Sequence, residues 1–133
     1  MAGRVPGRGA GIDPLRDVFI NDTLWVDEMK EIVETDECLE FRAELNADEF
    51  AEDRQIRRTL HDDGRLEYPF GEKVGGEDNL FAIRIRKGGN ARFFYAYDDG
   101  THIWILNGYE KKTEDIPRRE LKRARQLKRK YGL

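Results

Sequence analysis

Residues 80–109 read LFAIRIRKGGNARFFYAYDDGTHIWILNGY and decide the fold, because strand-like segments alternate in them with glycine-containing turns. In the first segment, Phe81, Ile83 and Ile85 fall on one face of a strand, and the residues between them fall on the other. The sequences KGGN and DDGT supply the positive φ angles that tight hairpins need. We therefore expect an antiparallel meander of three strands over this stretch.

Other elements are expected on both sides of this meander. Residues 29–34 predict a first strand, and Asp36 is expected to cap a helix that follows it. Asn46 and Glu49 have the spacing of a capping box, which opens a second helix. Pro117 marks the start of a last helix.

Because helices and strands occupy separate parts of the chain, the sequence predicts an α+β fold. The expected sheet is small and antiparallel or mixed, made of the three-strand meander and the N-terminal strand. Two helices are expected to pack on one face of the sheet, and a further helix is expected at the C-terminus. The length of 133 residues is that of one domain. Residues 1–14, rich in glycine and proline, predict a flexible tail, and residues 15–133 the domain, with a short helix near residues 15–19 and a core over about 30–133.

The composition argues against several classes of protein. No apolar run approaches the roughly 18–20 residues of a spanning helix, and no secretory signal is visible, so we expect a cytoplasmic protein without a membrane partner. The single cysteine, Cys38, cannot form an internal disulfide, which suits a reducing cytosol. Cys38, His61 and His102 do not have the spacing of zinc ligands, so no metal and no cofactor is expected.

Charge is distributed unevenly along the chain, although the net charge is only -3. Residues 1–78 contain 21 Asp and Glu against 10 Lys and Arg, whereas residues 79–133 contain 14 Lys and Arg against 6 Asp and Glu. Such asymmetry favours an anionic partner for the second part of the chain. The alternative is that the two parts neutralise each other in the fold.

Five basic residues near the ends of the predicted strands are candidates for an anion-binding site. Arg84 and Arg86 share one face of a strand, and Arg92 begins the next strand. Lys111 and Lys112 directly follow the third strand. A meander brings strand ends together, and clustered cations are tolerated mainly where an anion such as phosphate binds them. The alternative is that Arg84, Arg86 and Lys87 solvate an open sheet face and pair with the acidic helices.

This part of the chain resembles the RelE/HigB group of bacterial toxins from toxin–antitoxin pairs. Members of that group have a strand that ends in arginine, then a glycine turn, and then a second strand that contains an arginine and ends in tyrosine. Further along they have a glycine–aromatic pair, two lysines and a proline. The corresponding residues here are Ile83, Arg84, Gly88, Gly89, Arg92, Tyr95, Leu106, Gly108, Tyr109, Lys111, Lys112, Thr113 and Pro117. Gly64, Pro69 and Lys73 resemble an upstream loop of the group, and the resemblance covers about residues 30–133.

The resemblance implies a small endoribonuclease that cleaves messenger RNA on the ribosome, needs no metal and is silenced by a cognate helix-turn-helix antitoxin. In such chemistry the 2′-hydroxyl attacks the adjacent phosphate, so we assign Arg92 to the phosphate and Arg84 to supporting charge. Lys111 or Lys112 is assigned to phosphate contact or proton transfer. The residues expected to guide the RNA backbone are Lys73, Arg86, Lys87, Arg118 and Arg119.

Other residues and functions have competing interpretations. Tyr95 is expected to face away from Arg92 and to pack in the core. His102, Trp104 and Tyr109 are interpreted as packing residues, and the two larger aromatic rings have the alternative of stacking on bases. Two further functions stay open: a non-enzymatic inhibitor of DNA gyrase like the related ParE toxins, and a catalytically inactive nucleic-acid-binding member of the same fold.

Overall fold

The computed structural model describes residues 29–133, so the predicted tail and the short helix near residues 15–19 lie outside the described residues. The strands are β1 (Glu31–Glu34), β2 (Gly71–Lys73), β3 (Phe81–Arg84), β4 (Ala91–Tyr97) and β5 (His102–Glu110). They form one five-stranded sheet in the order β1-β5-β4-β3-β2. The helices of this part of the chain are α1 (Asp36–Arg42), α2 (Ala47–Asp63) and α3 (Arg118–Tyr131), which confirms the predicted α+β class.

The predicted meander is confirmed in strands β3, β4 and β5, which pair antiparallel. Its pairing contains an irregularity between Phe93 and Tyr95, where the register of β4 against β5 shifts. The N-terminal strand β1 is also confirmed, and it pairs parallel with the first half of β5, so the sheet is mixed. Tight turns join the strands of the meander, as their sequences predict; Gly88 has a φ of 75°.

Strand β2 is a correction to the sequence analysis, which treats this segment as a loop. Its three residues carry no readable alternation, and their extended conformation comes from antiparallel pairing with β3. Gly71 is required there, because a Cβ atom at this position would lie 2.4 Å from the Cβ of Leu66. Pairing with a distant partner therefore defines β2, and a local sequence pattern cannot reveal it.

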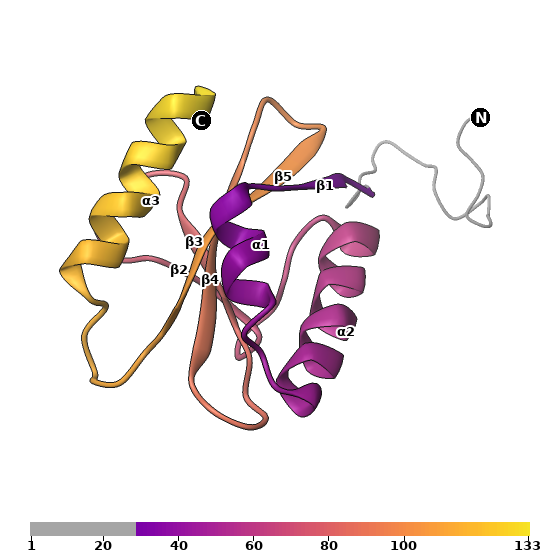
Figure 1. Ribbon diagram of the computed structural model, residues 1–133. Helices are drawn as coiled ribbons and strands as arrows, with labels where there is room; N and C mark the ends of the chain where they lie inside the picture. The colour runs from indigo at the N-terminus through magenta and orange to yellow at the C-terminus, as the bar shows by residue number, and fades with distance from the viewer. Residues whose placement is uncertain (1–28) are drawn as a thin grey trace, which may run out of the picture.

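Helices α1 and α2 cover one face of the sheet, as predicted, and α3 covers the other (Figure 1). The N-cap of α1 is Thr35 rather than the predicted Asp36: its buried hydroxyl accepts a hydrogen bond from the Cys38 N–H at 3.0 Å. The capping box of α2 is confirmed, with hydrogen bonds of 3.0 and 2.8 Å between Asn46 and Glu49.

The two faces of the sheet carry separate apolar clusters. On the side of α1 and α2 the largest buried rings are Phe93 and Tyr95. On the side of α3, Phe94 and its neighbours pack against the helix, and Trp104 stacks on Tyr131 at 4.8 Å between ring centroids. The sheet is therefore a middle layer, and side chains from alternate positions of one strand enter different cores.

Candidate anion-binding site

A row of three polar side chains crosses the sheet at the end of the meander. In register, Arg84 of β3 lies opposite Arg92 of β4, and Arg92 lies opposite Tyr109 of β5. Residues directly opposite in an antiparallel pair have Cβ atoms about 4.5–5.5 Å apart and point to the same face. All three therefore belong to the face that α3 covers, which Tyr109 shares with Phe94. We call Arg84, Arg92 and Tyr109 the arginine row.

Arg92 is buried without a counter-ion. Only 9% of its surface is exposed, and its Nη1 donates to the carbonyl oxygen of Ala91 at 3.2 Å. Within residues 29–133 no carboxylate lies within ion-pairing distance of this guanidinium. Burial lowers the pKa of Arg92, and the neighbouring charge of Arg84 lowers it further. A desolvated cation beside a second cation is unfavourable unless an anion joins them.

Arg84 is held in place from two sides. Its Nε lies 3.8 Å from a carboxylate oxygen of Glu72, which is an ion-pair distance but too long for a hydrogen bond. Its guanidinium carbon lies 5.4 Å from the ring centroid of Tyr68, in a cation–π arrangement. Within the described chain its terminal nitrogens have no hydrogen bond to protein, so they are available to an anion that also contacts Arg92.

Tyr109 contributes a hydroxyl group to the same row. Its ring is 4% exposed and stacks on Phe94 at 5.0 Å between centroids, which confirms the interpretation as a packing residue. Burial raises its pKa to about 12, against the opposing influence of the positive charge on Arg92. The phenol is therefore protonated at neutral pH and can donate a hydrogen bond or a proton. The sequence analysis omits this role, because the pairing of Tyr109 with Arg92 follows from the register alone.

The two predicted lysines lie at the end of β5 and differ in their surroundings. Lys111 is half-buried, and its backbone N–H donates to the carbonyl of Asn90 at 2.9 Å. Lys112 is exposed, and its Nζ lies 3.9 Å from Glu110. Lys111 thus lies directly beyond the end of β5, two residues after Tyr109.

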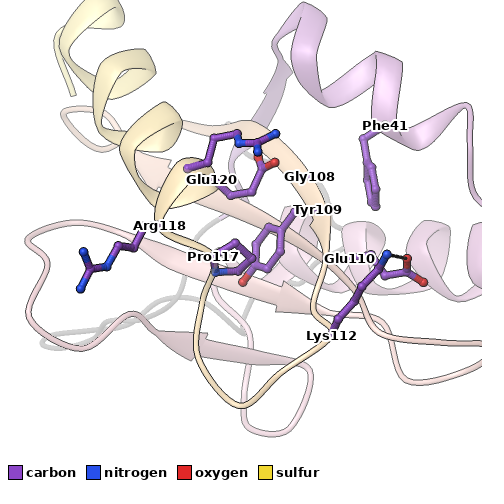
Figure 2. Close-up of a pocket in the computed structure, with 9 residues that line it drawn as sticks. Phe41, Gly108, Tyr109, Glu110, Lys112, Pro117, Arg118 and Glu120 are labelled. Atoms are coloured by element: carbon purple, nitrogen blue, oxygen red, sulfur yellow. Dashed lines mark ion pairs between the residues drawn. The ribbon is translucent and has the colours of Figure 1, made fainter.

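Lys112 lines an open pocket of about 550 Å³ between the ends of α1 and α3 (Figure 2). Phe41 of α1 forms one wall, and Pro117 and the first turn of α3 form another. A Cβ atom at Gly108 would lie 2.2 Å from the Phe41 ring, so only glycine allows this contact. Figure 2 shows Tyr109 beside Pro117, with Lys112 and Arg118 extending in different directions. The pocket therefore adjoins the arginine row through Tyr109.

The predicted RNA-guiding residues are spread around this region. Lys73 is in β2, and its Nζ donates to the carbonyl of Glu77 at 2.7 Å. Arg86 and Lys87 occupy the exposed turn between β3 and β4, where the N–H of Lys87 donates to Glu52 at 2.8 Å. Two further cations open α3 and line the pocket; these are Arg118 and Arg119. The structure thus places Arg84 directly beside Arg92. Lys73 lies toward the other end of β3, opposite Phe81, and the turn with Arg86 and Lys87 contacts α2.

The remaining aromatic and histidine residues have structural surroundings. Tyr95 is 2% exposed and faces the opposite core from Arg92, as predicted. His102, the first residue of β5, is not in either apolar cluster, contrary to its interpretation as a packing residue; its Nδ1 lies 3.0 Å from Asp98 in the preceding turn. Between residues 29 and 133 no group of three or more His, Cys, Asp and Glu side chains is placed to hold a metal ion. No helix in this described region is long and apolar enough to span a membrane.

Comparisons with known proteins relate this fold and site to one group. The chain has no significant sequence match among curated proteins. A mutant of the E. coli toxin RelE in the free state superposes with a TM-score of 0.58 at 12% identity, covering 74% of this chain and 96% of that one. The RelE–RelB complex from Pyrococcus horikoshii OT3 gives a TM-score of 0.53 at 16% identity, over 63% of this chain and 97% of the matched chain.

The YoeB dimer from Staphylococcus aureus gives a TM-score of 0.50 at 18% identity, over 63% of this chain and 98% of that one. At these identities the superpositions show a shared fold, and they confirm the RelE-like architecture that the sequence predicts. The family model described as "Phage derived protein Gp49-like (DUF891)" matches residues 40–129, which include the whole arginine row. The chain is therefore a RelE-fold protein that belongs to the phage-derived Gp49-like family.

Proposed function

We propose that this protein is the toxin of a toxin–antitoxin pair and an endoribonuclease that cleaves messenger RNA on the ribosome. The observation that carries the proposal is the burial of Arg92 beside Arg84, with no carboxylate within ion-pairing distance in the described chain. A phosphodiester supplies the missing negative charge, and a guanidinium contacts two of its oxygens at once. The RelE-like fold supports the same function, since the similar E. coli RelE is named as a toxin and is found in a toxin–antitoxin complex.

The reaction that fits these groups is transfer of the phosphate to the neighbouring ribose. The 2′-oxygen attacks phosphorus, the bond to the 5′-oxygen breaks, and the products are a 2′,3′-cyclic phosphate and a 5′-hydroxyl. Arg92, with Arg84 beside it, stabilises the charge that grows on the phosphoryl oxygens. Tyr109 donates a proton to the leaving 5′-oxygen. Lys111 or Lys112 either accepts the proton of the 2′-hydroxyl as the neutral amine, becoming an ammonium, or contacts the phosphate as the ammonium. The nucleophile comes from the substrate itself, so we propose that the reaction needs no metal.

The proposed partners follow from the charge of the second part of the chain. Lys73, Arg86 and Lys87 guide the RNA from the side of β2 and β3, and the first turn of α3 guides it from the other side. Such contacts suit a ribosome whose decoding site presents messenger RNA among ribosomal phosphates. We propose a helix-turn-helix antitoxin as the inhibitor, and the cytoplasm as the site of action.

A translation-dependent cleavage assay tests the proposed function. Purified protein is added to an extract that translates a defined message, and cleavage sites are mapped by primer extension. Cleavage is expected to depend on translation and to continue in EDTA when the magnesium concentration that ribosomes need is restored. A protein that stops growth while ribosome-bound messages stay intact and DNA supercoiling collapses would instead be a gyrase inhibitor.

A further inference from the structure

An exposed aromatic ring lies directly against the arginine row. Tyr68, in the segment that leads into β2, is 75% exposed, the highest value among the large apolar and aromatic residues exposed in the described chain. One face of its ring lies over Arg84 at 5.4 Å, and the high exposure leaves much of the ring open to solvent. A ring this exposed adds little to the core, so packing alone gives no account of its position beside Arg84.

We propose that Tyr68 is a stacking platform for one base of a single-stranded RNA whose phosphate binds the arginine row. This inference rests on the proposed function and adds to it the residue that engages the base. A nucleotide presents a phosphate and a flat base together. The structure offers two adjacent cations, of which Arg92 has no carboxylate within ion-pairing distance in the described chain, and an open ring in contact with Arg84. An inorganic anion or an acidic peptide would bind the two arginines but would not stack on the Tyr68 ring.

The chemistry of the platform also defines the form of the RNA. Bases in an A-form duplex are stacked on each other and cannot lie on a protein ring, whereas bases of a single strand can be splayed out. Every base has a π-face, so stacking on Tyr68 tolerates all four bases. We therefore expect Tyr68 to increase affinity without setting a sequence preference.

Binding of a short RNA analogue measures this role apart from cleavage. The probe is a fluorescein-labelled hexanucleotide of single-stranded RNA with a 2′-O-methyl group at every position, which removes the nucleophile. Its binding is followed by fluorescence anisotropy, free and as the message in programmed ribosomes. Tyr68→Ala is expected to weaken binding about 5- to 150-fold, the range for loss of one base–aromatic stack. Tyr68→Trp is expected to restore binding, because the larger ring also stacks.

The chain offers a matched control for this substitution. Phe50 of α2 is also exposed, at 40%, and also lies close to an arginine, with its ring centroid 4.9 Å from the guanidinium carbon of Arg42. It belongs to the helix layer on the opposite face of the sheet from the arginine row (Figure 1). Phe50→Ala is therefore expected to leave binding of the hexanucleotide unchanged.

A probe without bases separates stacking from mere support of Arg84. With a hexanucleotide that is abasic at every position, Tyr68→Ala is expected to have no effect, while Arg92→Ala still weakens binding. If Tyr68→Ala weakens binding of the abasic and the complete probe equally, Tyr68 only positions Arg84 and the proposal is overturned. Absence of binding of the complete probe to the wild-type protein, both free and in ribosomes, also overturns it. If Arg92→Ala changes neither probe, the anion site and the proposed function fail, whatever Tyr68 does.

Discussion

Substitution of Arg92 by methionine is expected to make the folded protein more stable and catalytically inactive. Methionine retains the unbranched apolar stem of the side chain but removes the charged group of a residue that is 9% exposed and has no carboxylate within ion-pairing distance in the described chain. It also removes repulsion from Arg84. The hydrogen bond to the Ala91 carbonyl is lost, yet that oxygen keeps its bond from the Ile85 N–H at 3.1 Å. No buried acceptor is orphaned, and we expect a gain of about 0.5–2 kcal/mol in the free energy of unfolding.

Urea denaturation followed by circular dichroism measures this gain, in a buffer free of phosphate and sulfate. Added sulfate is expected to stabilise the wild-type protein by binding the arginine row, by about 1.4 kcal/mol at ten times its dissociation constant. Arg92→Met is expected to lose this response and to keep only the general stabilisation that sulfate gives to folded proteins. Arg123→Met, which removes an exposed cation of α3, serves as the control and is expected to change stability by less than about 0.5 kcal/mol.

Activity completes the test of Arg92. In the translation-dependent assay, Arg92→Met is expected to reduce cleavage at least about 10²-fold, the usual scale for loss of one donor to the transition state. A destabilisation of more than about 1 kcal/mol would refute the reasoning, since it would show that the guanidinium has a favourable partner within the fold. Full activity in the folded variant would refute the role in catalysis.

Further predictions concern the lysines, the tyrosines and one helix cap. The double variant Lys111→Ala/Lys112→Ala is expected to lose cleavage activity more than either single variant, because adjacent amines can replace each other; rates in the extract assay check this. Tyr109→Phe is expected to lower the single-turnover rate about 10- to 10³-fold with little change in the urea midpoint, since the ring remains. Burial raises the pKa of Tyr109 to about 12 and the pKa of Tyr95 still further. The stability that these two neutral phenols contribute is therefore fully present below pH 10 and falls as the pH rises from 10 toward 12. Urea midpoints at pH 9 and pH 11 measure this fall. Asn46→Ala is expected to cost about 1 kcal/mol in urea denaturation through loss of the capping box of α2.

The parts of the fold that local patterns encode could be predicted from the sequence. The alternation of Phe81, Ile83 and Ile85 identifies a strand, and the glycine turns identify its partners. The capping box of α2 is readable because both of its hydrogen bonds lie within four residues. Strand β2 is not readable in this way, because three residues become a strand only by pairing with β3.

Which residues meet in the site depends on the pairing register of β3, β4 and β5. Sequence patterns define this register less well than they define the strands themselves. Arg84 and Arg92 were identifiable as a pair, since a short glycine turn joins their strands. Tyr109 comes opposite Arg92 only after the register shift between Phe93 and Tyr95, and that irregularity has no local signal. A one-residue change in register would turn the Tyr109 hydroxyl to the other face of the sheet.

Counting charges could not separate the arginines that hold the fold together from those that are available to a ligand. Arg42 and Arg57 both contact Asp53, at 2.9 and 2.8 Å, and both reach Glu34, so β1, α1 and α2 are joined by a partly buried network. This network neutralises acidic residues within the first part of the chain. Between the acidic and basic parts, the described residues form only two ion pairs, Arg84 with Glu72 and Arg125 with Glu77. Neutralisation between the two parts is thus limited. Burial without a carboxylate in ion-pairing distance, rather than position in a basic segment, distinguishes Arg92 from the other arginines of the described residues.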